Sequence, residues 1–461
     1  MEQRLLFIKK SAALALMICL TAFAAQAQQV ISLQKAVDLA LQNNLSIKQS
    51  AFSTAIDEAT YQQSKNNRLP SLSSSVSATE NFGRSVDLTT YQYINRSVLG
   101  ISPGLSASVA LFQGGQLQSQ ILANKLAIDY DKSSTTKIKN DLTLNVVVDY
   151  LQILTNLDLI TAAKQQIDIA KLTLDRTQKS VDAGNQTLAD LSQAKAGMST
   201  AELNLTTAQN QADLSILVLK QYMEMPAATE ISVERPDIST MTNIQTAFSA
   251  SDIAEQAVKV NPDVKLAEAQ QAIYAQNIKT AKGTFYPTLS MFGGLNSNYS
   301  NAQKQKVIGV DAVGAPIFAP YTFGSQLSDN FSQSIGLSLQ IPIFNKFNAH
   351  TNVKRATLNY QSAEVTTQIA KNNLAKTIYQ AVLDARASER QYQSSLQTYE
   401  ANKDAFNIIK QRYDVGLENS LNYNTSLTNL NKSQNDMIQA RYNMVFRSKV
   451  IDYYLGKPIT L

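Results

Sequence analysis

The chain repeats itself at one fixed offset, and this repeat limits what it can fold into. The first copy runs from Leu111 to Pro226 and is broken by Gly184, which follows a long segment without Gly or Pro. Adding 232 to each number reaches a second copy. Five positions keep their residue type at this offset: Phe112/Phe344, Asp182/Asp414, Gly184/Gly416, Tyr222/Tyr454 and Pro226/Pro458. Few chance alignments hold one offset over such a span, so the sequence predicts a duplicated module.

The N-terminus has the pattern of an export signal. Met1–Lys10 carries three cations, and Ser11–Ala24 is an apolar run that is too short to span a bilayer comfortably. Ala25-Gln26-Ala27 follows as a small-x-small cleavage site. We therefore expect residues 1–27 to be a signal peptide and the mature chain to begin at Gln28.

Composition excludes several classes of protein. The only cysteine, Cys19, lies in the signal peptide after Ile18, so we expect no lipid attachment, disulfide or cysteine-based metal site. A formal charge of +5, no basic run and no Trp argue against nucleic acid as a partner. No later stretch approaches eighteen apolar residues, so we expect no transmembrane helix. An exported chain of this kind can enter a membrane only as β-strands.

Short helices open each copy. Ser32–Asn43 predicts an amphipathic helix with Ser32 as its N-cap, and a second helix is expected over about 45–67. Their counterparts are a helix over about 253–259 and one that ends before Phe285. Pro70 and Pro287 are 217 apart rather than 232, so the second copy carries about fifteen extra residues between Pro287 and Phe344. An insertion confined to one interval usually marks a surface loop.

The same interval changes to a period of two, which is typical of strands. One hairpin is expected in each copy, over about 71–112 and about 288–344, with linking loops rich in Asn, Ser, Gly and Tyr. The clearest alternation covers Leu105–Leu111 and Ile335–Ile343. Soluble, half-buried hairpins would show the same pattern. If the strands span a membrane, four of them cannot close a barrel, but three chains would pool twelve.

The helical segments carry most of the mass. Apolar residues recur every three or four positions over Leu142–Leu174 and Leu191–Ala212, which indicates coiled-coil packing. Each long segment leads from a strand end to a glycine, Gly184 or Gly416, where we expect the chain to reverse roughly 100 Å away. The resulting domains are a first repeat over 28–226, a linker over 227–251 and a second repeat over 252–461. The linker has no clear period, and we expect it to be equatorial, which means that it lies around the helices partway along their length.

Five short phrases follow one another along the chain: Leu111-Phe112-Gln113-Gly114-Gly115, Asn261-Pro262-Asp263-Val264, Tyr286-Pro287-Thr288-Leu289, Ile341-Pro342-Ile343-Phe344 and Arg412-Tyr413-Asp414-Val415-Gly416-Leu417. In order and spacing, these phrases resemble the TolC-type outer-membrane efflux protein family over essentially the whole mature chain. The resemblance implies a mostly α-helical protomer with four membrane strands. It also implies a homotrimer with a twelve-stranded outer-membrane β-barrel and an α-helical periplasmic tunnel. The implied partners are a periplasmic adaptor, an inner-membrane transporter and outer-membrane lipid.

The resemblance also implies roles for individual residues. The adaptor contacts of the family's tip turns fall here on Gly184, Asn185, Gln186, Gly416, Leu417 and Glu418. A carboxylate that rings the closed entrance in many members falls on Asp190 in the first copy. In the second copy the equivalent position is Asn422, with Thr425 on the next turn. A trimer would therefore hold three carboxylates at that level, all from Asp190 and none from the second copy. Tyr413 matches a tyrosine that helps hold the entrance shut, and its offset partner is Val181.

Both roles have simpler alternatives. An Asp near a new helix start often only stabilises the helix N-terminus. A tyrosine at such a position is often a packed interface residue. For Asp190 and Tyr413 the sequence therefore leaves two interpretations open, a role at the entrance and a purely structural role.

The sequence offers no chemistry of its own. His350 is the only histidine, so a His-based triad or metal cluster is not available. Gly114-Gly115 and Gly293-Gly294 lack the pattern of a phosphate-binding loop. We expect no cofactor, no metal, no catalytic residue and no enzyme.

We therefore predict a passive outer-membrane channel of a tripartite efflux or type I secretion system, which conducts small molecules or proteins. A periplasmic coiled-coil adaptor would share the long helical hairpins, but it would need a lipoyl-like domain that the sequence lacks. A structural stalk or adhesin would not return through a glycine turn.

Overall fold

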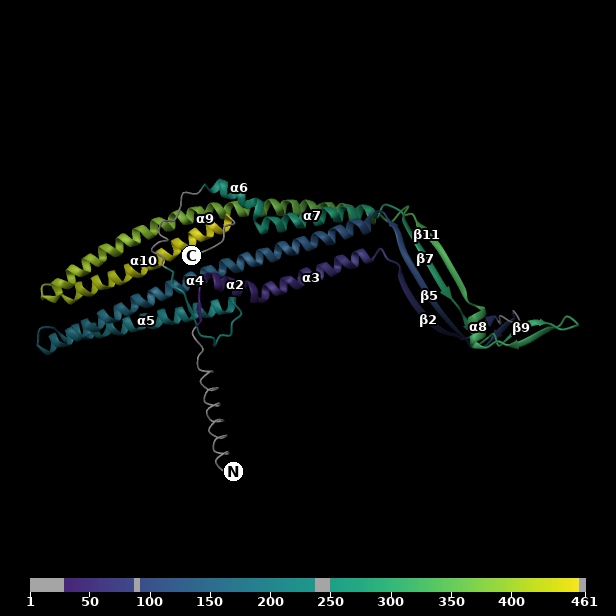
Figure 1. Ribbon diagram of the computed structural model, residues 1–461, viewed down its shortest axis with the longest axis horizontal. Coiled ribbons are helices and arrows are strands. Elements are labelled where there is room, and N and C mark those ends of the chain that lie inside the picture. The colour runs from purple at the N-terminus through teal and green to yellow at the C-terminus, as the bar shows by residue number, and fades with distance from the viewer. Residues whose placement is uncertain (1–28, 87–91, 237–248, 456–461) are drawn as a thin grey trace, which may run out of the picture. The chain divides into compact units, whose positions relative to one another are not determined.

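The computed structural model describes residues 29–86, 92–236 and 249–455 (Figure 1). The predicted signal peptide lies outside the described residues. The chain divides into two compact units. The first holds the described parts of Met1–Phe52, Ser133–Lys265 and Ile369–Leu461, and the second holds those of Ser53–Lys132 and Leu266–Gln368. Each unit is taken by itself below.

The helices of the two copies begin and end at equivalent residues. At an offset of 217, α2 (Leu33–Asn43) and α3 (Leu45–Asn66) match α6 (Ala250–Val260) and α7 (Pro262–Gly283). At an offset of 232, α4 (Gln116–Asp182) and α5 (Leu188–Tyr222) match α9 (Asn348–Asp414) and α10 (Ser420–Tyr454). The caps repeat as well, because Ser32 and Ser249 each accept a hydrogen bond from the backbone N–H three residues on. The predicted mostly helical fold with tandem copies is confirmed.

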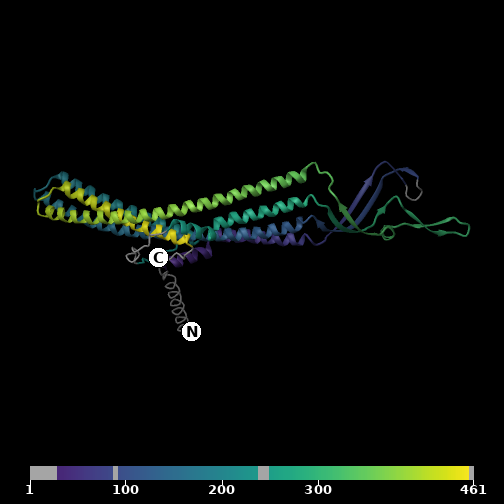
Figure 2. The same ribbon diagram turned by 90° about the horizontal axis from the view of Figure 1, so that it is seen from above.

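The second unit contains an antiparallel sheet with the strand order β11-β7-β5-β2. Its strands are β2 (Ser71–Asn81), β5 (Val98–Gln113), β7 (Thr288–Asn296) and β11 (Ser332–Gln340). β2 pairs with β5 and β7 pairs with β11, as the two predicted hairpins require. β5 pairs with β7 and so joins the copies. The attached helices follow in the same order, α9, α7, α4 and α3 (Figures 1 and 2).

Two strand ends differ from the sequence prediction. The alternation suggested a strand through Ile343, but β11 ends at Gln340. Pro342 has no N–H for the ladder, and the chain then turns through left-handed residues at Lys346 and Phe347. In the first hairpin, β5 begins at Val98, before the clear alternation, because its early residues pair with the end of β2.

The extra residues of the second copy form structure where a plain loop was expected. They include β8 (Tyr299–Ser300), a two-stranded hairpin of β9 (Gln305–Val310) and β10 (Pro316–Pro320), and the short helix α8 (Phe323–Asp329). The buried side chain of Gln326 holds the base of this insertion, accepting from the backbone N–H of Ser300 at 2.8 Å and donating to the carbonyl of Gln303 at 2.7 Å. In the first copy the corresponding loop contains only β3 (Arg84–Val86) and β4 (Tyr93–Asn95) among its described residues.

The first unit consists mainly of two helical hairpins, α4–α5 and α9–α10. Beside them β1 (Gln29–Ile31) pairs in parallel with β6 (Ile231–Val233) of the expected linker. The phenol of Tyr150 on α4 is buried in the main core and donates to the carbonyl of Glu234 at 2.8 Å. Most of the remaining linker, 237–248, lies outside the described residues.

Of the described helices, only α4 contains a window apolar enough to cross a membrane by length and composition. In that window 61% of the residues are buried inside the protein. The core helix of a soluble protein passes the same test, and the buried face of α4 accounts for the apolar residues.

Candidate functional site at the helical tips

Each helical hairpin reverses through a glycine turn of the same geometry. Gly184 and Gly416 have φ values of 74° and 77°, the left-handed region that glycine adopts without steric cost. The N–H of Gly184 donates to the carbonyl of Val181, and the N–H of the next residue donates to Ser180. The same pair of bonds follows Gly416. Both turns are therefore Schellman motifs, which satisfy the last carbonyls of α4 and α9.

The helix that leaves the first turn begins with a capping box. Thr187 caps α5, and its backbone N–H and hydroxyl both donate to the Asp190 carboxylate, at 3.0 and 2.7 Å. The hydroxyl of Ser420, the first residue of α10, donates to the other oxygen of Asp190. These hydrogen bonds, with that from Ser420 the largest cause, lower the pKa of Asp190 below its usual value. Asp190 thus stabilises a helix start and also links the two hairpins.

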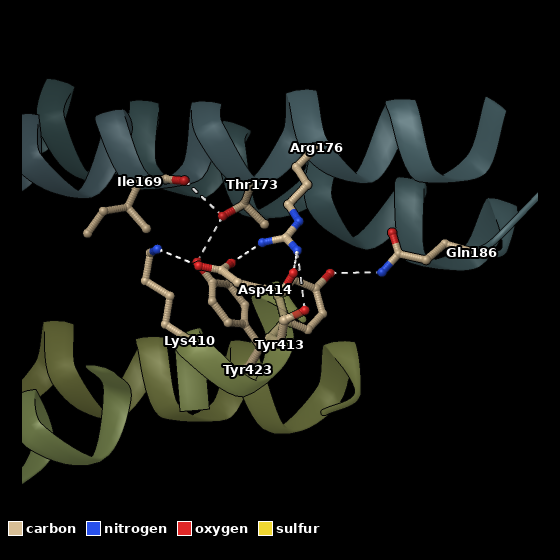
Figure 3. A network of polar contacts seen from close by, with 8 residues as sticks. All are labelled: Ile169, Thr173, Arg176, Gln186, Lys410, Tyr413, Asp414 and Tyr423. Carbon is tan, nitrogen blue, oxygen red and sulfur yellow. Dashed lines mark hydrogen bonds and ion pairs between the residues drawn. The ribbon is translucent and has the colours of Figure 1, made fainter. Parts of the chain in front are cut away.

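A buried tyrosine forms a second link between the hairpins (Figure 3). Tyr413, in the last turn of α9, is 8% exposed, and its ring stacks on Tyr423 with centroids 4.6 Å apart. Its hydroxyl accepts a hydrogen bond from Nε2 of Gln186 in the first tip turn, at 2.9 Å. The hydroxyl of Tyr423 lies 3.1 Å from that of Thr173 on α4. Burial raises the pKa of Tyr423 and keeps its phenol neutral.

Arg176 on α4 completes the cluster (Figure 3). Its guanidinium forms an ion pair with Asp414 and donates to the backbone carbonyls of Tyr413 and Asp414. Lys410 contacts the same carboxylate at 2.8 Å. A cation on the last carbonyls of α9 is favourable because the C-terminal end of a helix carries partial negative charge. One side chain of the first hairpin therefore caps a helix of the second.

The remaining predicted tip residues lie at the surface or in local contacts. Asn422 donates to Glu418 at 2.8 Å, and this bond is the largest cause of a lowered Glu418 pKa. Thr425 donates to the carbonyl of Leu421 in its own helix. Asn185 and Leu417 are exposed beside their glycines. Of the predicted tip residues, Gln186, Tyr413 and Asp190 thus take part in contacts between the hairpins, as the hydrogen bonds Gln186–Tyr413 and Asp190–Ser420. The other predicted residues form no such hydrogen bond within the described part of the chain.

Arg176, Ser420 and Tyr423 had not been singled out from the sequence. At an offset of 232, Arg176 corresponds to Ile408, so the repeat carried no signal for it. Within the described ranges no cluster of His, Cys, Asp and Glu could hold a metal ion. The site consists of hydrogen bonds, ion pairs and stacked rings that hold helix ends together.

Comparison with known proteins identifies the family. The model of the outer membrane efflux protein family matches residues 36–223 and 253–457. The chain belongs to the outer membrane efflux protein family. It is 22% identical to outer membrane protein TolC of Escherichia coli (strain K12) over 361 residues, which are 77% of this chain and 69% of TolC. It is 24% identical over 200 residues to the probable efflux pump outer membrane protein TtgC of Pseudomonas putida, and this match spans 35% of that relative.

Solved structures give the same fold. CusC matches with a TM-score of 0.77 at 16% identity, over 94% of each chain. The Campylobacter jejuni CmeC outer membrane channel matches with a TM-score of 0.74 at 18% identity, over 92% of this chain and 85% of that one. This chain is an outer-membrane efflux channel protein, as the sequence predicted. The family is one of efflux channels, not of enzymes.

Proposed function

We propose that three copies of this chain form a passive conduit from the periplasm to the exterior. The observation that carries this proposal is the open sheet of the second unit. β2 and β11 each have one unpaired edge among the described strands, and open edges are not tolerated in lipid. One face of β11 presents Ile335, Leu337 and Leu339, which are 77, 65 and 60% exposed. Three such sheets would supply twelve strands, with this apolar face toward lipid.

The helical tips are the end that we assign to the periplasmic partners. An adaptor protein would dock on the exposed residues beside Gly184 and Gly416, and an inner-membrane transporter would supply the energy. Cargo of either kind, small molecules or proteins, fits a conduit without chemistry of its own. The exposed turn residues Asn185 and Leu417 support this assignment because tightly structured glycine turns hold them outward.

The cluster around Tyr413 acts, in this proposal, as a latch that keeps the periplasmic entrance closed. Gln186–Tyr413, Asp190–Ser420 and Arg176–Asp414 all join one hairpin to the other. Separating the hairpins would break all three links, and each is polar and partly exposed, so the cost of opening is moderate. Asp190 would also place one carboxylate per copy near the entrance, without an acidic partner at Asn422.

The assembly proposal is tested by extracting the protein from outer membranes in mild detergent and measuring its mass by light scattering with detergent correction. We expect three chains per particle. A stable monomer, or recovery of the protein in the soluble periplasmic fraction, would refute the proposal.

A further inference from the structure

The edge strands and the central strands of the sheet differ in exposure. Every residue of β2 and nearly every residue of β11 is exposed, whereas most residues of β5 and many of β7 are partly covered. β5 belongs to the first copy and β7 to the second, so their pairing is a joint between copies. The chain thus contains one complete pairing between copies, β5 with β7. The equivalent strands, β11 and β2, each have an edge unpaired with any described strand, at the two ends of the sheet.

Equivalent residues pair with each other in the two hairpins, so the register of the β5–β7 pair can be applied to the equivalent strands, β11 and β2. Leu72 faces Ala107 in the first hairpin, and the equivalent residues, Leu289 and Leu339, face each other in the second. In the joint, Leu105 faces Leu295. The equivalent of Leu105 in the second copy is Leu337 of β11, 232 positions later, and the equivalent of Leu295 in the first copy is Ala78 of β2, 217 positions earlier. The same register would therefore pair Leu337 with Ala78. These two residues lie on opposite edges of one sheet and can meet only between different chains.

The helices above the joint give an independent indication. Leu126 on α4 and Ile273 on α7 are half-buried, and in both views these helices lie side by side (Figures 1 and 2). Their equivalents, Leu358 on α9 and Ile56 on α3, are 54 and 65% exposed. Large apolar residues are therefore uncovered at the positions that the equivalent pairing of β11 with β2 would cover.

The strand-to-helix junctions show where the two joints must differ. Gly114 and Gly115 have φ values of 58° and 78°, and the equivalent Lys346 and Phe347 have φ values of 55° and 60°. A non-glycine residue in this region costs about 1 kcal/mol or more, so the second junction keeps a strained backbone with ordinary side chains. A Cβ on Gly114 would lie only 2.3 Å from the carbonyl oxygen of Gly283, the last residue of α7. Gly114 therefore sits directly against the end of that helix.

From this equivalence we infer that Lys346 lies at the C-terminal end of α3 of the neighbouring copy, in a seam that repeats the β5–β7 register. The residue equivalent to Gly283 is Asn66, the last residue of α3. Because Lys346 carries a side chain where the in-chain joint tolerates none, the seam is wider at this level. The ammonium group then lies at the C-terminal end of the partner's α3, which carries partial negative charge and where a cation is favourable. This inference rests on the proposed trimer and specifies its contacts.

The register is tested by disulfide cross-linking in the full-length protein, whose mature chain contains no native cysteine. The variant Leu337→Cys with Ala78→Cys should form covalent dimers and trimers in non-reducing gels, because directly paired strand residues have Cα atoms about 5 Å apart. The matched control is Leu337→Cys with Val76→Cys, displaced by two residues on the same face, and it should link much more weakly. Preferential linking of the displaced pair, or of neither pair in a particle of three chains, overturns the inferred register. A particle that is not a trimer overturns the proposed function instead.

The role of Lys346 is tested by the temperature and rate at which trimers dissociate in detergent. Lys346→Met keeps the length of the side chain but removes its charge, and we expect dissociation about two- to five-fold faster at low salt. The difference should shrink as salt is raised. Lys354→Met, an exposed lysine further along α9, is the matched control and should leave the rate unchanged. Equal rates for Lys346→Met and the unmodified protein would refute the inferred contact.

Discussion

The hydroxyl of Tyr413 accepts a hydrogen bond from the side-chain amide of Gln186 at 2.9 Å, across 227 positions of sequence. This bond joins the tip turn of the first hairpin to the last turn of α9. It lies beside the Tyr413–Tyr423 stack and the Arg176–Asp414 ion pair, so one small cluster joins the two hairpin ends.

Tyr413→Phe should loosen this latch without disturbing the ring stack. The variant loses one hydrogen bond and leaves the Gln186 amide unpaired, at a cost of about 1 kcal/mol. Cells that carry the variant should become more sensitive to a bulky antibiotic that the outer membrane normally excludes. Tyr399→Phe, about four turns earlier on α9, is the control. Unchanged sensitivity, with normal protein levels, would argue against a closing role for Tyr413.

Replacing Arg176 should expose the backbone amides that follow α9 to solvent, and more so in the Ala variant than in the Lys variant. Lys keeps the positive charge but cannot donate in a fork, whereas Ala removes both the ion pair and the bonds to the carbonyls of Tyr413 and Asp414. Amide hydrogen exchange at Gly416 and Leu417 should therefore be fastest in Arg176→Ala, intermediate in Arg176→Lys and slowest in the unmodified protein. An identical exchange rate in all three would show that the capping contact contributes nothing to the turn.

Much of the fold follows from sequence because its signals are local or repeated. Glycines at equivalent positions mark both tips, and helix ends carry recognisable caps such as Ser32. The contacts of the tip could not be derived in this way, since Arg176 and Asp414 are 238 positions apart and Arg176 has no equivalent in the second copy. The β5–β7 pairing also depends on tertiary packing rather than on a period in the sequence. The β9–β10 hairpin is closed by a local turn at Asp311 and Gly314, which had not been singled out from the sequence.

Asp149 should make stability depend on pH near neutrality. This half-buried carboxylate on α4 has an oxygen without a hydrogen-bond partner, and burial raises its pKa to about 7 from 3.8. The folded state thus holds this proton more tightly, so the contribution of Asp149 to stability is greatest at low pH and is lost as pH rises from about 4 to about 7. After discounting for partial exposure, Asp149→Asn should stabilise the protein by about 2 kcal/mol at pH 8.

The advantage of Asp149→Asn should be small near pH 4, where the carboxyl group is protonated in the folded state and about half protonated in the unfolded chain. Thermal unfolding at pH 4, 6 and 8 measures this difference. Asp168→Asn, a change of the same charge at an exposed position on α4, is the control. A stabilisation that is equal at all three pH values would contradict the assignment.

Gly416→Pro should impair export but leave assembly intact. Proline fixes φ near −65°, whereas this position needs 77°, and proline also lacks the N–H that bonds to the carbonyl of Tyr413. Gly416→Ala keeps the N–H and should cost only about 1 kcal/mol. Export of a known cargo and the particle mass are measured together for both variants. Normal export by Gly416→Pro would place the docking surface elsewhere.

Asp190→Asn should separate the two roles of this carboxylate. The charge is lost, so block of the channel by a trivalent cation should weaken if Asp190 lines the entrance. Thr187→Ala breaks the same capping box without changing the charge, at a cost of about 1 kcal/mol, and should leave the block unchanged. If both variants weaken the block equally, Asp190 acts only through the helix start.

The most direct test of the account is the single-channel conductance of the purified protein in planar bilayers. If the tip cluster holds the periplasmic end closed, as proposed, the unmodified protein should insert as a channel of low conductance. The double variant Arg176→Ala with Tyr413→Phe should open to a conductance several times larger. Channels of equal conductance would contradict the latch, and the absence of any channel from correctly folded protein would contradict the conduit itself.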